Sequence, residues 1–213
     1  YNDLTLAFWL IVAGIVFDFF DGFVARLLHS PSAIGVQLDS LADVITSGLA
    51  PAAVLWQVCL QTEPCWLPEA WKLGYGVFVL AAFSALRLAK FNIDETQTVE
   101  FCGLPTPAGS LLCASLGMLW QQGMLALSSD GVLLIAVLTS LLLVSPIRMF
   151  ALKFHGFGWR GNEVRYLFLL ASIVLIIILR TYAIPVIIVL YIVVSAVRWL
   201  CMHSGNPDKA PKA

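Results

Sequence analysis

Four aspartates near the start of the chain have the residue type and the spacing to do chemistry. Asp18 and Asp21 interrupt a long apolar run, and Asp39 and Asp43 follow it, one helical turn apart. Four carboxylates that meet in a low dielectric cannot all stay ionised unless cations neutralise them. Hard divalent cations prefer oxygen ligands, and a pair of them can hold the attacking and leaving oxygens of a phosphoryl transfer. These residues therefore predict a metal site that serves phosphoryl chemistry.

Small residues and one arginine share a helix side with the first two aspartates. Helical periodicity places Gly22, Ala25 and Arg26 on the same side as Asp18 and Asp21. Because Gly22 and Ala25 carry little side chain, a ligand could approach this side closely. Arg26 lies a little over two turns beyond Asp18, where its planar guanidinium could meet a phosphate held at the metal site.

The composition indicates what kind of molecule must position these residues. Of 213 residues, 60% are hydrophobic and only 12% are charged, the net charge is −1, and the mean hydropathy is +0.91. An ordinary soluble domain has about 25% charged residues, so this chain has too few charges to coat a soluble globule. A disordered chain, a coiled coil and a nucleic-acid binder with a basic face are excluded as well. We interpret the chain as an all-α, polytopic transmembrane bundle of about seven helices of ~20 residues each.

Charge-free runs and helix length define the predicted spans. Short apolar runs could also be buried strands, but an open sheet would leave unpaired edges in lipid, and the alternating pattern of a barrel is absent. The last two helices are expected to form a hairpin that turns at Arg180–Pro185. One transmembrane domain is expected over 1–202, with a polar cytoplasmic tail over 203–213. The predicted helices cover residues 4–28, 36–61, 71–91, 107–127, 131–150, 164–180 and 183–201.

The distribution of basic residues predicts which side faces the cytoplasm. Ten of the twelve Lys and Arg residues fall on the side of loop 29–35 when seven spans alternate. By the positive-inside rule, loops 29–35, 92–106 and 150–163 are then cytoplasmic. The connection from Arg26 to Asp39 is short, so the first two helices should be antiparallel neighbours. Their four carboxylates would then converge at the cytoplasmic edge of the membrane.

The acidic motif, taken in order, is Asp18-x2-Asp21-Gly22-x2-Ala25-Arg26-x8-Gly35-x3-Asp39-x3-Asp43. It resembles the signature of the CDP-alcohol phosphatidyltransferase family at every fixed position. The resemblance implies an integral-membrane enzyme whose active site lies at the cytoplasmic face and holds two divalent cations, Mg²⁺ or Mn²⁺. It also implies that a homodimer can form and that a further helix precedes Tyr1 in the natural protein. It assigns metal binding to the four aspartates, the general base to Asp43, and contacts with the CDP moiety to Gly22, Ala25, Arg26 and Gly35.

Three further stretches resemble the serine-specific branch of this family, the phosphatidylserine synthases. They are LDSLAD at 38–43, SALRLAKFN at 84–92 and GLPTPA at 103–108. This resemblance implies that the donor is CDP-diacylglycerol, which lies among the membrane lipids, and that the acceptor is L-serine. The products would be phosphatidylserine and CMP. The carboxylate of serine is a natural partner for the planar fork of an arginine. We therefore expect serine to be bound by Arg87 first, then by Asn92 and Arg148.

Alternatives to these assignments stay open at the level of the sequence. The two arginines could be ordinary cytoplasmic flanks of the helices, and Asn92 a polar helix end. The same chemistry could use another alcohol, such as glycerol 3-phosphate or inositol. A non-enzymatic cation carrier also has acidic residues inside a helical bundle, but it predicts broken helices, mid-membrane carboxylates and a route to both faces. A lone Asp elsewhere is interpreted as a helix cap or a solvated charge, which applies to Asp3, Asp94, Asp130 and Asp208.

Overall fold

The computed structural model describes residues 3–28, 32–66, 70–93, 100–150 and 162–204, and it confirms an all-α helix bundle. A two-stranded antiparallel sheet, β1–β2, joins two of the connections between helices. The elements are α1 (Leu4–Leu27), α2 (Ala33–Asp43), the π-helical turn η1 (Val44–Leu49), α3 (Ala50–Gln61), the 3-10 helix η2 (Ala70–Phe78), α4 (Val79–Ile93), β1 (Glu100–Cys102), α5 (Thr106–Gln121), α6 (Ser129–Leu143), β2 (Arg148–Phe150), α7 (Glu163–Leu179), the 3-10 turn η3 (Arg180–Tyr182) and α8 (Ala183–Ser204).

The predicted spans correspond to these elements, with corrections at two helix ends. The span predicted over 107–127 stops at Gln121, and Gly123 beyond it adopts a left-handed φ of +70°. The span predicted over 131–150 stops at Leu143, and residues 148–150 form β2 instead. Pro146 accounts for the second correction, because proline lacks the N–H that a helix needs and disfavours helical backbone in the residue before it. Both errors concern boundaries, and neither changes the order of the helices.

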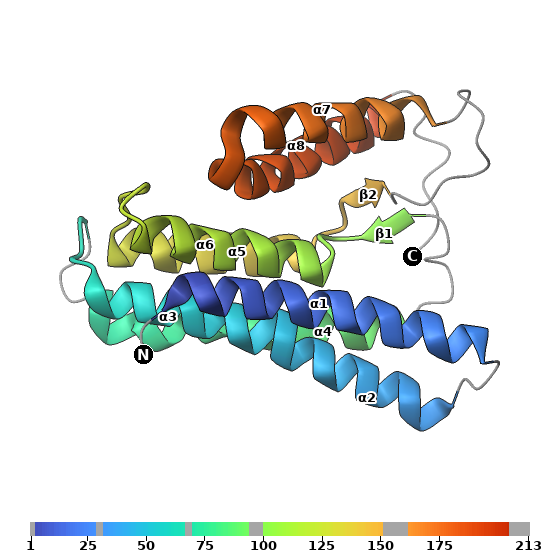
Figure 1. Cartoon of the computed structure of the whole chain (residues 1–213), viewed down its shortest axis with the longest axis horizontal. Helices are drawn as coiled ribbons and strands as arrows, with labels where there is room; N and C mark the ends of the chain where they lie inside the picture. The colour runs from blue at the N-terminus through green and yellow to red at the C-terminus, as the bar shows by residue number, and fades with distance from the viewer. Residues whose placement is uncertain (1–2, 29–31, 67–69, 94–99, 151–161, 205–213) are drawn as a thin grey trace.

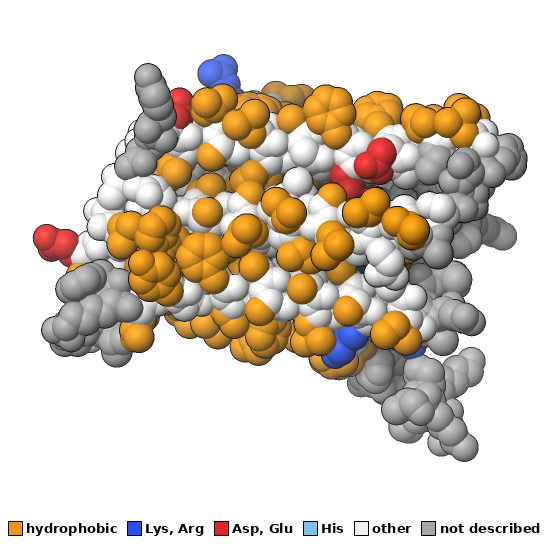
Figure 2. All heavy atoms as spheres, turned by 90° about the horizontal axis from the view of Figure 1, so that it is seen from below, with side chains coloured by type: hydrophobic (Ala, Val, Ile, Leu, Met, Phe, Trp, Pro, Cys, Tyr) orange, Lys and Arg blue, Asp and Glu red, His pale blue; other side chains and the backbone are white. Residues whose placement is uncertain are grey.

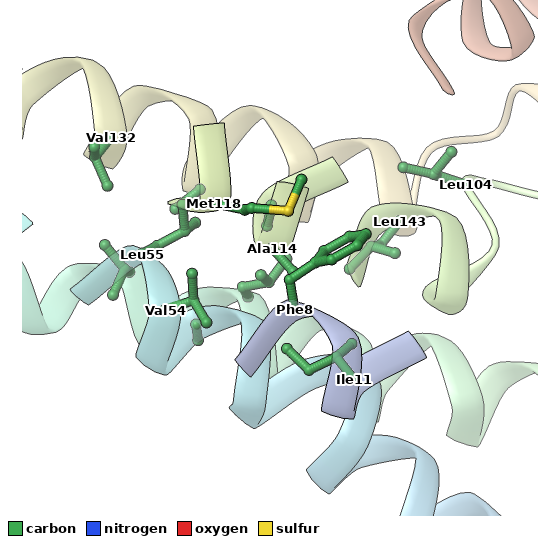
Figure 3. Close-up of a cluster of buried hydrophobic side chains, with 14 of the residues drawn as sticks. Phe8, Ile11, Val54, Leu55, Leu104, Ala114, Met118, Val132 and Leu143 are labelled. Carbon is green, nitrogen blue, oxygen red and sulfur yellow. The ribbon is translucent and has the colours of Figure 1, made fainter. Parts of the chain in front are cut away.

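The helices pack in three layers, which Figure 1 shows edge-on. The first layer contains α1, α3 and α4, with α2 splayed from its end; α5 and α6 form the second layer, and the α7–α8 hairpin forms the third. The core lies between the first two layers, where Phe8 of α1, Leu55 of α3 and Met118 of α5 are buried together (Figure 3). Gly117 allows α5 to approach closely, since a Cβ there would run into Val54 of α3.

An aromatic cluster attaches the third layer to the sheet. Phe150 of β2 lies between Phe168 of α7 and Tyr191 of α8, with ring centroids 5.6 and 4.9 Å away. The Tyr191 hydroxyl also donates to the backbone oxygen of Phe150 at 3.0 Å. The hairpin predicted at Arg180–Pro185 is present, with η3 as its turn.

The outer surface of the bundle is apolar. In the part of the chain that the structure describes, four stretches are long and apolar enough to cross a membrane: Leu4–Val24, Ile34–Gln61, Leu73–Ile93 and Glu163–Cys201, the last of which contains both α7 and α8. Large side chains on them are open to the surroundings, as Phe17 is at 73% exposure and Ile177 at 71%. Figure 2 shows one face on which apolar side chains dominate and charged ones are few. Exposure of so much apolar surface to water would be unfavourable, so the chain is an integral membrane protein.

The antiparallel packing brings three connections to one end of the bundle. The end of α1 and the start of α2 lie at that end, together with the β1–β2 sheet and the start of α7 (Figure 1). The ends of the loops predicted to be cytoplasmic, 29–35, 92–106 and 150–163, therefore lie on the same side of the molecule. Residues 29–31, 94–99 and 151–161 of these loops, and the tail beyond Ser204, are outside the described residues.

Candidate active site

An acidic cluster lies where α1 and α2 meet. Asp18 and Asp21 come from α1 and Asp39 from α2, and one carboxylate oxygen from each lies within 4.8 Å of the others. The prediction that these helices are antiparallel neighbours is confirmed by this approach. Asp18 is half-buried, whereas Asp21 and Asp39 are exposed. Three carboxylates at this separation repel one another unless a proton or a cation reduces the negative charge.

Asp43 lies one turn beyond Asp39, at the last position of α2. It is outside the group of three mutually close carboxylates, and it is more buried than Asp21 and Asp39. Its Oδ1 is buried without a hydrogen-bond partner among the described residues. A buried carboxylate oxygen without a partner is costly, so this atom has free capacity for a cation or a proton. With all four residues offering only hard carboxylate oxygens, the donor set fits Mg²⁺ or Mn²⁺.

The π-helical turn η1 brings Asp43 close to α4. It begins directly after Asp43, and single π-helical turns inside longer helices are frequent at functional sites. Within it, Gly48 is buried against α4, where a Cβ would come within 3.0 Å of the Ser84 Cβ. Because Arg87 follows Ser84 by three positions, it lies on the same side of α4. The Asp43 carboxylate and the Arg87 guanidinium are close enough to attract each other electrostatically.

Arg87 is buried, and a hydrogen bond to the start of α5 holds it. It is 9% exposed, and its Nη1 donates to the Thr106 hydroxyl at 2.9 Å. Its guanidinium carbon lies 5.9 Å from the centroid of the Phe91 ring. Its Nε has no hydrogen-bond partner among the described residues. Arg87 also lines a cavity of about 430 Å³ beside the sheet, together with Lys90, Phe91, Ile93, Cys102, Leu143, Val144, Ser145 and Pro146.

The other two residues predicted to bind serine have different surroundings. Asn92 is exposed at the end of α4, and its Nδ2 donates to the Ser40 hydroxyl at 2.8 Å, which links α4 to α2 between Asp39 and Asp43. Arg148 is exposed on β2 opposite Cys102, which lines the cavity, but Arg148 itself does not line it. Only Arg87 of the three candidates contributes to the cavity wall.

Two residues near Arg87, Lys90 and Thr106, were not predicted as site residues from the sequence. Lys90 follows Arg87 by three positions and therefore lies near it on the same helix face, a spacing that is visible in the sequence. Thr106 lies 19 positions from Arg87, and no local pattern connects the two. Asp130, interpreted as structural, accepts hydrogen bonds from the backbone N–H groups of Cys65 and Trp66 at 3.0 and 2.8 Å.

The residues assigned to the CDP moiety lie on α1 and α2. Among the described residues, nothing lies within 4 Å of the position that a Cβ of Gly22 would take, so they leave this side of α1 open to a ligand. The Gly35 N–H donates to the Ser32 hydroxyl at 3.0 Å, and Ser32 is the N-cap of α2. Ala25 and Arg26 belong to α1, but their side chains are outside the described part of the structure.

Comparison with known proteins places the chain in a family. Relatives from Bacillus subtilis, Helicobacter pylori and Mycobacterium tuberculosis all have the name CDP-diacylglycerol–serine O-phosphatidyltransferase. The first is 33% identical over 156 residues, with 73% of this chain and 81% of the relative covered. The second is 31% identical over 203 residues, with 93% and 81% covered, and the third is 35% identical over 220 residues, with 95% and 73% covered. A family model described as CDP-alcohol phosphatidyltransferase matches residues 1–151, which include the whole acidic motif. The chain belongs to the CDP-alcohol phosphatidyltransferase family.

Proposed function

We propose that the protein makes phosphatidylserine and CMP from CDP-diacylglycerol and L-serine. The observation that carries this proposal is the cluster of Asp18, Asp21 and Asp39 within 4.8 Å, with half-buried Asp43 one turn beyond. The acceptor is supported by the name that the three relatives share. The distribution of basic residues supports a site at the cytoplasmic face. A homodimer, which the family resemblance implies, stays a prediction.

Two divalent cations, Mg²⁺ or Mn²⁺, would be held by Asp18, Asp21, Asp39 and Asp43. When bound, such a pair supplies charge stabilisation for the oxygens of an in-line phosphoryl displacement. The four aspartate carboxylates would hold that positive charge at the junction of α1 and α2. Open space over Gly22 leaves room for the donor diphosphate beside the cluster.

Asp43 is the general base in this proposal. Its buried Oδ1, which has no hydrogen-bond partner among the described residues, takes the proton from the serine hydroxyl. The serine oxygen then forms a bond to the phosphorus that carries diacylglycerol, and the bond from that phosphorus to the oxygen of CMP breaks. CMP leaves as an anion, and Arg26 on the same helix side as Asp18 is the residue proposed to meet its phosphate.

Arg87 is the proposed partner of the serine carboxylate. It is buried near Asp43, so a serine whose hydroxyl meets Asp43 can present its carboxylate to Arg87. The cavity of about 430 Å³ that Arg87 and Lys90 line falls within the usual size of small-ligand sites, ~300–1,000 Å³. The positively charged side chains of Arg87 and Lys90 in one cavity wall favour an anionic ligand. Asn92 instead supports α2 through Ser40, and Arg148 stays a prediction at the edge of the cavity.

The cation-carrier alternative is not favoured by the fold. It requires broken helices near the middle of the membrane, but α1 is continuous from Leu4 to Leu27, and Asp18 and Asp21 lie in its second half. The acidic cluster lies where the second half of α1 approaches α2, and α1 ends at Leu27, less than two turns beyond Asp21.

The proposed acceptor can be tested with the purified protein in detergent. CDP-diacylglycerol and Mg²⁺ or Mn²⁺ are supplied with labelled serine, glycerol 3-phosphate or inositol in separate reactions. We expect CMP release and a labelled lipid with serine alone, because the relatives share the name of a serine-specific transferase and Arg87 can pair with the serine carboxylate. Release with another alcohol but not with serine would assign a different acceptor. Cation flux in vesicles without CMP release from any alcohol would contradict an enzymatic function altogether.

Replacing Arg87 with Gln should raise the KM for serine. Hydrogen bonds to a charged group contribute about 1.5–3 kcal/mol, so we expect a rise of at least roughly tenfold with little change in the KM for CDP-diacylglycerol. Steady-state kinetics with each substrate varied in turn measures both constants. Arg180→Gln, in the turn between α7 and α8 at the opposite end of the bundle, is the matched control. An unchanged KM for serine in the Arg87 variant would remove this residue from the acceptor site.

A further inference from the structure

Thr106 lies in the GLPTPA stretch, to which the proposed function assigns no role. It is the first residue of α5 and its side chain is fully buried, at 0% exposure. Its hydroxyl oxygen accepts the hydrogen bond that Arg87 Nη1 donates at 2.9 Å. A buried guanidinium needs acceptors for its donors, and this hydroxyl supplies one of them.

The backbone around Thr106 is fixed by contacts with the end of α6. The N–H of Gly103 donates to the Ile147 oxygen, and the N–H of Leu104 donates to the Leu142 oxygen, both at 2.9 Å. Gly103 has a φ of +76°, and a Cβ there would collide with the Leu143 oxygen, so only glycine fits this close approach. The hydroxyl of Thr106 is therefore presented to Arg87 from a rigid support.

Because Thr106 offers a hydroxyl and not a carboxylate, the positive charge of Arg87 remains available to a ligand. A carboxylate in this place would hold the guanidinium and also neutralise its charge. A hydroxyl holds the guanidinium through one donor and leaves its positive charge for another anion. The guanidinium has five N–H donors, of which the Nε donor is buried without a partner among the described residues.

We propose that Thr106 is a positioning residue for the acceptor: it orients the Arg87 guanidinium so that the remaining donors and the charge serve the carboxylate of the acceptor in the adjoining cavity. The inference rests on the proposed function, in which Arg87 binds serine. The hydrogen bond between Arg87 and Thr106 joins two of the stretches that resemble the serine branch, 84–92 and 103–108. The Asn92–Ser40 bond joins 84–92 to 38–43 in the same way.

The test compares Thr106→Val, which removes the hydroxyl at nearly constant volume, with Thr106→Ser, which keeps it. Thr106 acts on serine only by orienting Arg87, so losing its hydroxyl should cost less than losing Arg87 itself, and we take a change of roughly 3- to 10-fold in an equilibrium constant. We expect Val to raise the KM for serine by that factor, with kcat and the KM for CDP-diacylglycerol within about twofold of the wild type, and Ser to restore the KM. In an Arg87→Gln background, Thr106→Val should have no further effect on the KM for serine.

A matched control is Thr139→Val, since Thr139 is also buried, in α6, where its hydroxyl contacts the Cys113 sulfur. It should leave the KM for serine unchanged. Thermal unfolding in detergent shows whether Thr106→Val is folded, and Thr106→Ala removes the hydroxyl with less bulk if it is not. Equal KM shifts for Val and Ser, or a loss of kcat and both KM values together, would overturn the positioning role. A wild type that releases no CMP with serine refutes the proposed function and this inference with it, whereas serine turnover with an unshifted KM in the Val variant refutes this inference alone.

Discussion

Replacing Asp43 with Asn is expected to lower kcat by about 10²- to 10⁴-fold, the range that a general base contributes, while CDP-diacylglycerol still binds. Asparagine keeps an oxygen that can face a cation, but its amide cannot take the proton from the serine hydroxyl. The Oδ1 of Asp43 is buried and without a hydrogen-bond partner among the described residues, so it is free to accept that proton.

The measurement separates proton transfer from binding. CMP release at saturating serine gives kcat, and retention of labelled CDP-diacylglycerol by the purified protein reports donor binding. Asp3→Asn is the control, because Asp3 accepts a hydrogen bond from the Leu6 N–H at the start of α1, and asparagine serves equally well as a helix cap. Retained turnover in the Asp43 variant would remove this residue as the base. Loss of donor binding as well would assign it a role in holding the donor.

Removal of divalent cations with a chelator is expected to abolish CMP release, and added Mg²⁺ or Mn²⁺ should restore it. The physical reason is the acidic cluster, in which three carboxylates within 4.8 Å need positive charge to hold an anionic diphosphate nearby. Loss of a residue that merely supports a metal ligand already weakens metal affinity about 10- to 100-fold. Asp18→Asn removes the charge of a ligand itself, so we expect the metal concentration for half-maximal activity to rise by at least that factor.

A second readout avoids dependence on activity. Metal that binds the folded protein should raise its thermal unfolding temperature in detergent, and this rise should be smaller in Asp18→Asn than in Asp3→Asn. Turnover that persists in the chelator, together with an unfolding temperature that metal does not change, would contradict a metal site at the cluster. Asp18 is the informative position because it is the least exposed of the three and comes from α1 rather than α2.

The location of the acidic motif was predictable from local sequence alone. Residues three or four positions apart on a helix lie on one side of it, so spacing is enough to pair Asp18 with Asp21, and Asp39 with Asp43. The short connection between the two pairs then required antiparallel neighbours, and the approach of Asp39 to α1 confirms this. The apolar runs predicted the membrane-embedded bundle in a similar way, because composition and length decide whether a helix can lie in lipid.

The surroundings of each polar side chain depended on the tertiary structure. Asn92 and Ser40 are 52 positions apart, and Arg87 and Thr106 are 19 apart, yet each pair forms a hydrogen bond. Such bonds form only after packing has brought the helices together, so helical periodicity could select Arg87 and Asn92 as polar but could not say what they contact. The pairing of β1 with β2 has the same origin, and it replaces the end of the helix predicted to continue to residue 150.

The sequence by itself therefore determined the class of the molecule and its helix order, which follow from composition and run length, and it predicted the carboxylates of the candidate site, which follow from periodicity within single helices. Only the tertiary structure separated Arg87, which lines the cavity beside Thr106, from Asn92, which supports α2. The physical reason is that the role of a polar residue in a membrane bundle depends on which partner a neighbouring helix offers it, and that partner is distant in the chain.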